Sequence, residues 1–250
     1  MMEEWRARAP TLAQECAELW SLRLGEPYEY AYVSLAVRVE LRDGTLAVLK
    51  VGWPHPEAEH EADALAHYDG RGAVRLLAHD RERNALLLER CEPGTPLREL
   101  PEDEALPIAA DVLRRLWRPP AEDHPFDLLA DLATEWAGLP GLDAGLVSDL
   151  VGSQGQLVVC HQDFHSANLL RAQREPWLAI DPKPIVGERE FDTAAIVRDR
   201  QPIADAGVLR RRLDVLSTEL GLDRERVRLW AIVHAVAWEH PEVAGLLLRL

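Results

Sequence analysis

Strand-like and helix-like sequence occupy different parts of this 250-residue chain, and this separation most constrains its fold. Residues 30–51 are rich in β-branched and aromatic side chains, and the pair Asp43-Gly44 divides them into two apolar runs. An Asp-Gly pair in this setting is a strong signal for a β-hairpin. We therefore expect antiparallel strands over 34–41 and 46–51, with two more strands in "RLLAHD" and "NALLLERC".

The rest of the chain has mainly helical spacing of its apolar residues. This spacing predicts helices over 2–22, 56–70, 102–117, 126–138, 142–152, 192–200, 205–220 and 223–239. Short strands ending at Cys160 and Ile180 interrupt the series, and the Pro/Gly-rich stretch 92–97 separates the two kinds of sequence. We expect an α+β chain with a small antiparallel-sheet lobe over 1–91 and a larger, mainly helical lobe over 92–250.

Composition narrows the setting of the protein. Hydrophobic residues make up 47 % of the chain, which is typical of a folded globular protein. No apolar run approaches the roughly 20 residues that span a bilayer, and the first ten residues lack the pattern of a secretory signal. The three cysteines, Cys16, Cys91 and Cys160, lie too far apart for a zinc motif. We expect a cytoplasmic protein without a membrane partner, and a monomer by default.

The charge balance is acidic, with a formal net charge of −15. This sign disfavours a nucleic-acid partner and suits a cationic small molecule, although net charge also serves solubility alone. Of the 28 basic residues only Lys50 and Lys183 are lysines. A chain that otherwise uses arginine retains these two as candidates for a role that needs a compact point charge.

The segment "HQDFHSANLL", residues 161–170, follows an apolar run and admits three interpretations. His161, Asp163 and His165 alternate, so an extended segment would present all three on one side as zinc ligands. The second interpretation is a polar turn without chemistry. The third is a phosphate-transfer loop, in which Asp163 acts as a base and Asn168 binds a metal ion.

A second apolar strand, in "WLAIDPKP", also delivers a carboxylate, Asp181, at its end. We expect this strand to lie beside the one ending at Cys160, which brings Asp163, Asn168 and Asp181 together. Phosphoryl transfer requires such a set: one carboxylate orients the attacking hydroxyl, and a carboxamide and a second carboxylate bind Mg²⁺. The same chemistry requires a cation on a strand of the first lobe and an acid on the next helix.

Lys50 ends the expected hairpin, and Glu57, Glu59 and Glu61 lie on the helix that follows it. The first lobe therefore supplies both groups in the required order. This agreement between two distant parts of the chain favours phosphoryl transfer over a metallohydrolase or an inert polar turn.

These motifs resemble those of the aminoglycoside phosphotransferases, which have a protein-kinase-like fold. "HQDFHSANLL" resembles the family loop written H-G-D-x-H-x-x-N, and "AIDPKPIVGEREFD" is most similar to the branch of streptomycin 6-phosphotransferases and hydroxyurea phosphotransferases. The resemblance covers roughly residues 30–200. It implies a two-lobed kinase that uses ATP and Mg²⁺ and phosphorylates a hydroxyl group of a small molecule.

The resemblance also implies roles for individual residues. Asp163 corresponds to the catalytic base, and Asn168 and Asp181 correspond to the magnesium ligands. Lys50 corresponds to the lysine that contacts the α- and β-phosphates. Glu61 is the best match for its helix partner, ahead of Glu57 and Glu59.

Further positions follow from the same resemblance. Backbone groups at Glu89 and Cys91 are expected to hold the adenine, and Asp192 is expected to pin the following helix to the catalytic loop. Lys183, next to the metal carboxylate, is our candidate for neutralising phosphate charge. Ser34 is either a phosphate contact or an ordinary strand serine.

The chain departs from the family pattern in two places. Gln162 stands where glycine is usual, so the backbone of the loop is expected to differ there. The expected phosphate-covering turn over 26–34 has no glycine between Pro27 and Ser34, which puts nucleotide affinity in question.

The expected substrate is a cationic aminoglycoside such as streptomycin, whose guanidinium groups would pair with carboxylates. Candidate carboxylates are Glu135, Asp199 and Glu239, and Trp136 and Trp238 are candidates for stacking. A metabolic alcohol or hydroxyurea is the alternative acceptor. A nucleotide-binding protein without transfer activity is the alternative from another functional class.

Overall fold

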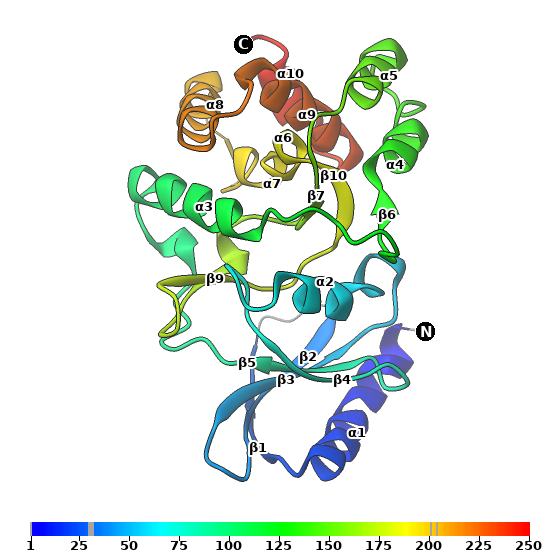
Figure 1. Cartoon of the computed structure of the whole chain (residues 1–250), viewed down its shortest axis with the longest axis vertical. Helices are drawn as coiled ribbons and strands as arrows, with labels where there is room; N and C mark the ends of the chain where they lie inside the picture. The colour runs from blue at the N-terminus through cyan, green and yellow to red at the C-terminus, as the bar shows by residue number, and fades with distance from the viewer. Residues whose placement is uncertain (1, 30–32, 201, 204) are drawn as a thin grey trace.

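The computed structural model describes residues 2–29, 33–200, 202–203 and 205–250, which form two lobes (Figure 1). The sheet-containing lobe holds α1 Met2–Trp20, β1 Arg23–Pro27, β2 Ser34–Glu40, β3 Leu46–Gly52, α2 Glu61–Tyr68, β4 Leu76–Asp80 and β5 Ala85–Glu89. The other lobe holds α3 Glu102–Leu116, β6 Asp127–Leu128, α4 Leu129–Trp136, α5 Ala144–Gly152, β7 Leu157–Cys160, β8 Leu169–Arg171, β9 Trp177–Ala179, β10 Ile185–Glu188, α6 Arg189–Asp192, α7 Ala194–Val197, α8 Ala206–Leu220, α9 Arg224–Ala237 and α10 Pro241–Leu247.

The first lobe is built on an antiparallel sheet with the strand order β1-β2-β3-β5-β4. The expected hairpin is present, with β2 and β3 paired from Ser34–Gly52 to Glu40–Leu46 and Asp43-Gly44 in the turn between them. β1 was not expected, because its sequence contains Gly25 and Pro27 and shows no alternation.

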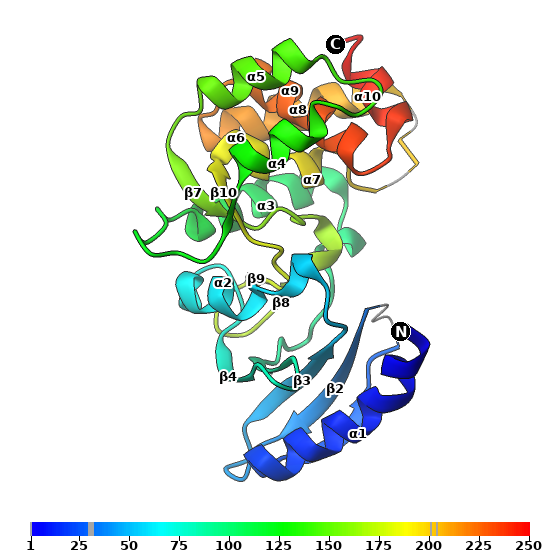
Figure 2. The same cartoon turned by 90° about the vertical axis from the view of Figure 1, so that its right-hand side faces the viewer.

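The two faces of this sheet have different partners. Leu49 and Val51 of β3 are fully buried against α1, which packs on one face through Leu12 and Cys16 (Figure 2). Side chains alternate along a strand, so Lys50 points to the opposite face. The helix α2 lies on that side, between the sheet and the helical lobe (Figure 1). The alternation of β3 thus directs Lys50 toward the interface between the lobes.

The helix expected over 56–70 is divided. Pro56–Ala58 form a short 3₁₀ turn, and α2 begins only at Glu61. Proline at the first position starts the 3₁₀ turn well, but the turn does not continue into the α-helix. As a result Glu61 lies in the first turn of α2, and Glu57 lies in the preceding turn.

The second lobe is mainly helical, as expected, and contains two small sheets. β7 pairs with β10, which also pairs with β6, whereas β8 and β9 form a separate hairpin. The expectation that the strands ending at Cys160 and Ile180 are neighbours in one sheet is therefore wrong. The segments that follow them still meet, because the backbone N–H of Lys183 donates to the carbonyl of His161 at 3.0 Å.

The β8–β9 hairpin also contacts the connection between the lobes. Arg171 of β8 donates its backbone N–H to Thr95 at 2.9 Å, and Val74 donates to Ala179 of β9 at 3.0 Å. The hairpin is thus bonded to segments before and after residues 91 and 92, so its contacts do not mark the lobe boundary. The division at 91/92 remains our proposal.

Among the helices that the structure describes, none has both the length and the apolar character needed to cross a membrane.

Candidate active site

Lys50 lies at the centre of a charged cluster between the lobes. Its Nζ atom is 2.7 and 2.6 Å from the two carboxylate oxygens of Glu61 and 2.6 Å from Oδ1 of Asp181. The structure therefore pairs Lys50 with Glu61, the residue that the resemblance favoured among the three glutamates. The same contact joins β3 of one lobe to the segment after β9 of the other.

Burial and charge act in opposite directions in this cluster. Burial alone would lower the pKa of Lys50, but the carboxylates of Glu61 and Asp181 outweigh it and raise that pKa. Burial raises the pKa of Glu61 to about 6, and the nearby Lys50 limits the rise. Burial also acts to raise the pKa of Asp181, but Lys50 outweighs it and lowers that pKa. Lys50 is thus held as a cation.

The second lysine lies beside the expected base. Nζ of Lys183 is 3.2 Å from Oδ2 of Asp163 and 3.4 Å from Oε2 of Glu57. Burial would lower the pKa of Lys183, but Asp163 and Glu57 outweigh it and raise that pKa. Both lysines of the chain are therefore in the same region, each paired with a carboxylate of the expected site.

Asn168 ends the loop and contacts the backbone of Asp163. Its Nδ2 atom donates to the backbone carbonyl of Asp163 at 3.0 Å, which orients the carboxamide oxygen away from that carbonyl. Its own carbonyl accepts from the N–H of Ile180 at 2.9 Å and so ties the Asn168 segment to the strand that precedes Asp181. Carboxamide and carboxylate oxygens are the donors that Mg²⁺ prefers, so Asn168 and Asp181 fit this ion chemically.

The loop from His161 to His165 is not extended, so the alternating zinc arrangement does not form. Gln162 has a φ of 65°, and the N–H of Asp163 donates to the carbonyl of His161 at 2.8 Å. His161 is fully buried, and its Nε2 contacts the carbonyl of Ile180 at 3.0 Å. Across the described residues, no group of three or more His, Cys, Asp or Glu side chains is placed to bind a metal ion.

Asp192 binds the backbone of the loop 161–165 through its carboxylate. Its Oδ1 atom accepts from the backbone N–H of Gln162 at 2.8 Å, and its Oδ2 atom accepts from Nε1 of Trp117 at 2.9 Å. The side chain is only 1 % exposed. This geometry agrees with the pinning role that the resemblance implied, and it adds Trp117 as a partner that the sequence did not indicate.

One pocket collects several of the expected nucleotide-site residues. Ser34, Lys50 and Glu61 line it from the sheet lobe, and Asp181 and Lys183 line it from the other lobe. Ser34 is the first residue of β2 and pairs with Gly52. Part of the expected phosphate-covering turn, residues 30–32, lies outside the described residues.

The expected adenine-binding residues lie at the connection between the lobes. Glu89 ends β5; its N–H donates to the carbonyl of Arg75 at 2.9 Å, and its carboxylate accepts from Arg174. Cys91 is buried, and burial raises the pKa of its thiol to about 12, so the thiol stays neutral. Neither residue lines the pocket around Lys50.

The three candidate substrate carboxylates have different surroundings. Asp199 accepts backbone N–H groups from Ser166 at 2.9 Å and from Arg200 at 2.7 Å, which supports the turn that carries Asn168. Glu135 at the end of α4 and Glu239 after α9 are both exposed. They flank Trp136 and Trp238, whose rings pack edge to face with centroids 5.3 Å apart.

Two parts of the arrangement were missed in the sequence. Glu57 contacts Lys183 rather than Lys50. The sequence carries no signal for this contact, because its pattern starts the helix at Pro56, ahead of Glu57. Arg174, at the tip of the β8–β9 hairpin, holds Glu89 from the other lobe. The turn around Arg174 is a short polar segment, and its sequence carries no motif that marks it.

Comparison with solved structures shows a kinase fold. The chain resembles a putative fructosamine-3-kinase from Thermobifida fusca with a TM-score of 0.60 and 19 % identity, over 96 % of this chain and 99 % of that one. It resembles a thermostable mutant of an aminoglycoside phosphotransferase with a TM-score of 0.59 and 14 % identity, over 94 % and 95 % of the two chains. The expected protein-kinase-like, two-lobed α+β fold is confirmed.

Comparison with known sequences shows the family. A streptomycin 6-kinase from Streptomyces griseus is 37 % identical over 91 % of this chain and 81 % of its own. A hydroxyurea phosphotransferase from Kitasatospora aureofaciens is 36 % identical over 92 % of this chain and 73 % of its own. Residues 23–240 match the family described as aminoglycoside/hydroxyurea antibiotic resistance kinases. The chain therefore belongs to this family of phosphotransferases, as its motifs suggested.

Proposed function

We propose that the protein transfers the γ-phosphate of ATP, in the presence of Mg²⁺, to a hydroxyl group of a cationic aminoglycoside, with streptomycin as the first candidate. One observation carries this proposal. Two ion pairs, Lys50 with Glu61 and Lys183 with Asp163, lie at one interface between the lobes, and Asp181 reaches Lys50 across it.

In this proposal Asp163 orients the acceptor hydroxyl and accepts its proton at a carboxylate oxygen. Lys50, oriented by Glu61, binds the α- and β-phosphates, and Ser34 is a further candidate contact in the same pocket. Lys183 is held next to Asp163, where its charge would stabilise the transferred phosphoryl group. Backbone groups at Glu89 and Cys91 are our candidates for the adenine.

Asn168 and Asp181 are the residues that would hold Mg²⁺. When bound, the ion would neutralise phosphate charge during transfer. Asp181 is now paired with Lys50, so its carboxylate would be shared between this lysine and the ion. The oxygen donors of both residues suit a hard cation.

The proposed acceptor follows from charge as well as from the relatives. The net charge of −15 attracts a cation toward the protein. Glu135 and Glu239 are our candidates for pairing with a guanidinium group beside Trp136 and Trp238. Asp199 remains a candidate, although both of its oxygens already accept backbone N–H groups.

The proposal is tested by measuring ADP release with ATP and Mg²⁺, with and without streptomycin, kanamycin or hydroxyurea. We expect release that depends on streptomycin and a product heavier by one phosphate. Stimulation by hydroxyurea alone would assign the acceptor to the other branch of the family. If none of the three stimulates release while ATP still binds, the proposed acceptor is wrong.

The role of Asp163 is tested with Asp163→Asn. This variant keeps the size of the side chain and removes the base, so we expect kcat to fall by about 10²–10⁴-fold while ATP binding is retained. His165→Gln is the matched control, because His165 lies 3.7 Å from Asp163 and has no assigned step. Equal loss in both variants would contradict the assignment.

A further inference from the structure

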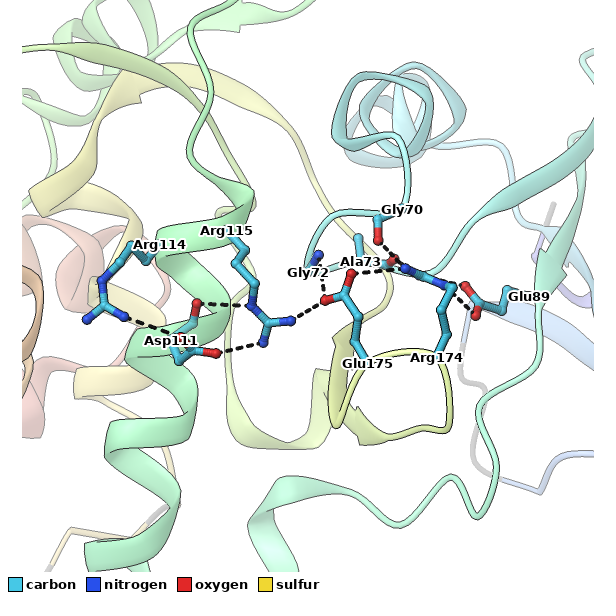
Figure 3. Close-up of polar contacts among 9 residues, drawn as sticks. All are labelled: Gly70, Gly72, Ala73, Glu89, Asp111, Arg114, Arg115, Arg174 and Glu175. Carbon is cyan, nitrogen blue, oxygen red and sulfur yellow. Dashed lines mark hydrogen bonds and ion pairs between the residues drawn. The ribbon is translucent and has the colours of Figure 1, made fainter.

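The tip of the β8–β9 hairpin forms a polar junction between the lobes (Figure 3). Arg174 donates from Nε and Nη2 to the two carboxylate oxygens of Glu89, both at 2.8 Å. The same guanidinium donates to the backbone carbonyls of Gly70 at 2.6 Å and Ala73 at 2.9 Å. Arg174 thus binds one side chain and two backbone groups of the sheet lobe.

The neighbouring residue makes the corresponding contact to the helical lobe. Glu175 accepts from Arg115 of α3 and from the N–H of Gly72 at 3.3 Å, and it contacts Arg174 at 3.0 Å (Figure 3). Arg115 is in turn paired with Asp111 at 3.0 Å. A continuous series of ion pairs and hydrogen bonds therefore runs from α3 through the hairpin tip to Glu89.

The two ends of this hairpin carry the proposed metal ligands. Asn168 directly precedes β8, and Asp181 follows β9 by two residues. Glu89, the partner of Arg174, is the last residue of β5, where we propose that the adenine is held. The Arg174–Glu89 pair thus joins the segment proposed for the base of ATP to the segment proposed for its phosphates.

The pair is suited to hold this position. Burial would raise the pKa of Glu89, but hydrogen bonds from Arg174 and from the N–H of Arg75 outweigh it and lower that pKa. The hydrogen bonds to Glu89 also raise the pKa of Arg174. Both groups are therefore charged at neutral pH, and a bidentate guanidinium–carboxylate contact fixes orientation as well as distance.

We propose that Arg174 is a positioning residue for the nucleotide, which sets the adenine-binding segment at a fixed distance from Asn168 and Asp181 by clamping Glu89. The inference rests on the proposed function, because it assumes that ATP lies between these segments. In this proposal Arg174 contacts neither ATP nor the acceptor. Its loss should therefore weaken nucleotide binding without changing the acceptor site.

The test compares Arg174→Ala and Arg174→Lys with the wild-type protein by calorimetric titration with Mg-ATP. We expect the Kd for Mg-ATP to rise about tenfold for Arg174→Ala and less for Arg174→Lys, which keeps the charge but cannot make the bidentate contact to Glu89. The KM for the acceptor should stay unchanged. Arg114→Ala is the matched control, because Arg114 lies on α3 and contacts Asp111 and the carbonyl of Glu219 but no residue of the hairpin.

Glu89→Gln supplies a second, independent measurement. It should raise the Kd for Mg-ATP as Arg174→Ala does, and the double variant should add little, because both changes break one contact. A role in folding alone would lower the melting temperature but leave the Kd of the folded protein at the wild-type value. That result, with wild-type binding intact, would overturn this inference alone. A wild-type protein that binds no Mg-ATP would overturn the proposed function and this inference with it.

Discussion

Two residues of the proposed site adopt a backbone conformation that residues with a Cβ atom rarely take. Gln162 has a φ of 65° and Asp181 a φ of 61°. Aspartate tolerates this left-handed region, but glutamine is unusual there. Glycine, the residue written at this position of the family loop that the sequence resembles, adopts this conformation readily. The N–H of Gln162 still reaches Asp192 at 2.8 Å.

His161 makes the stability of the protein depend on pH. Its Nε2 contacts the carbonyl of Ile180, its Nδ1 is buried without a partner among the described residues, and burial lowers its pKa from 6.5 to about 4. Because the pKa of His161 is lower in the folded state than in the unfolded state, neutral His161 stabilises the fold at pH values above 6.5. This stabilisation is lost as the pH falls from 6.5 through about 4. We expect the wild type to lose about 3 kcal/mol relative to His161→Gln between pH 7 and pH 4.

The measurement is the free energy of unfolding by urea at several pH values for both proteins. Other titrating groups are common to the two chains, so their contributions cancel in the difference. A difference that stays constant across this range would show that His161 has an ordinary pKa, and the assigned neutral form would be wrong.

At the scale of elements, the sequence predicted most long helices and strands but fewer of the short ones. The hairpin around Asp43-Gly44 was predicted because its turn chemistry is local. β10, the four-residue strand Ile185–Glu188, was missed because it is too short to show a period, and its partners lie far away in the chain. Of the helix expected over 192–200, only the short α7, Ala194–Val197, is present, and Asp192 instead ends α6.

The same reasoning applies to the site. The proximity of Lys50, Asp163, Asn168 and Asp181 was predictable, because each lies near the end of a strand, or in the segment after one, that the sequence reveals. The pairing of Glu89 with Arg174 was not, because 85 positions separate them and neither lies in a motif for such a contact. Contacts of this kind depend on how the elements pack, which a single sequence does not encode locally.

The link between α6 and the catalytic loop gives a prediction at this scale. Both oxygens of Asp192 accept N–H groups, one from Gln162 and one from Trp117. In Asp192→Asn the amide nitrogen would face one of these donors, so we expect a loss of about 1–3 kcal/mol in the free energy of unfolding. We expect kcat to fall as well, because the loop carries Asp163.

Trp117→Phe is the matched control for Asp192→Asn. It removes the indole N–H that donates to Asp192. In the double variant the new amide nitrogen can therefore face position 117 without meeting another N–H group. We expect the double variant to be more stable than additive losses would give, by about 1 kcal/mol. Purely additive losses in urea denaturation would contradict the shared hydrogen bond.

At the scale of the whole molecule, ion pairs between described residues join the two lobes both beside the pocket and at the connection. Lys50 and Asp181 join them on the side of the pocket, and Arg174 and Glu89 join them at the connection. The β8–β9 hairpin takes part in both contacts, because Asp181 follows it and Arg174 lies at its tip. The relative position of the lobes therefore depends on this hairpin as well as on the chain connection at 92–97.

The net charge of −15 gives a prediction for the whole molecule. If the field of the protein attracts the acceptor, salt should weaken the binding of a cationic acceptor, because the Debye length falls from about 10 Å at 0.1 M salt to about 3 Å at 1 M. We expect the KM for streptomycin to rise about threefold or more between 0.05 and 0.5 M KCl, with kcat nearly constant. Sucrose at equal osmolality is the control, since it leaves charges unscreened. A KM that is the same at both salt concentrations would mean that the acidic surface serves solubility and has no part in capturing the substrate.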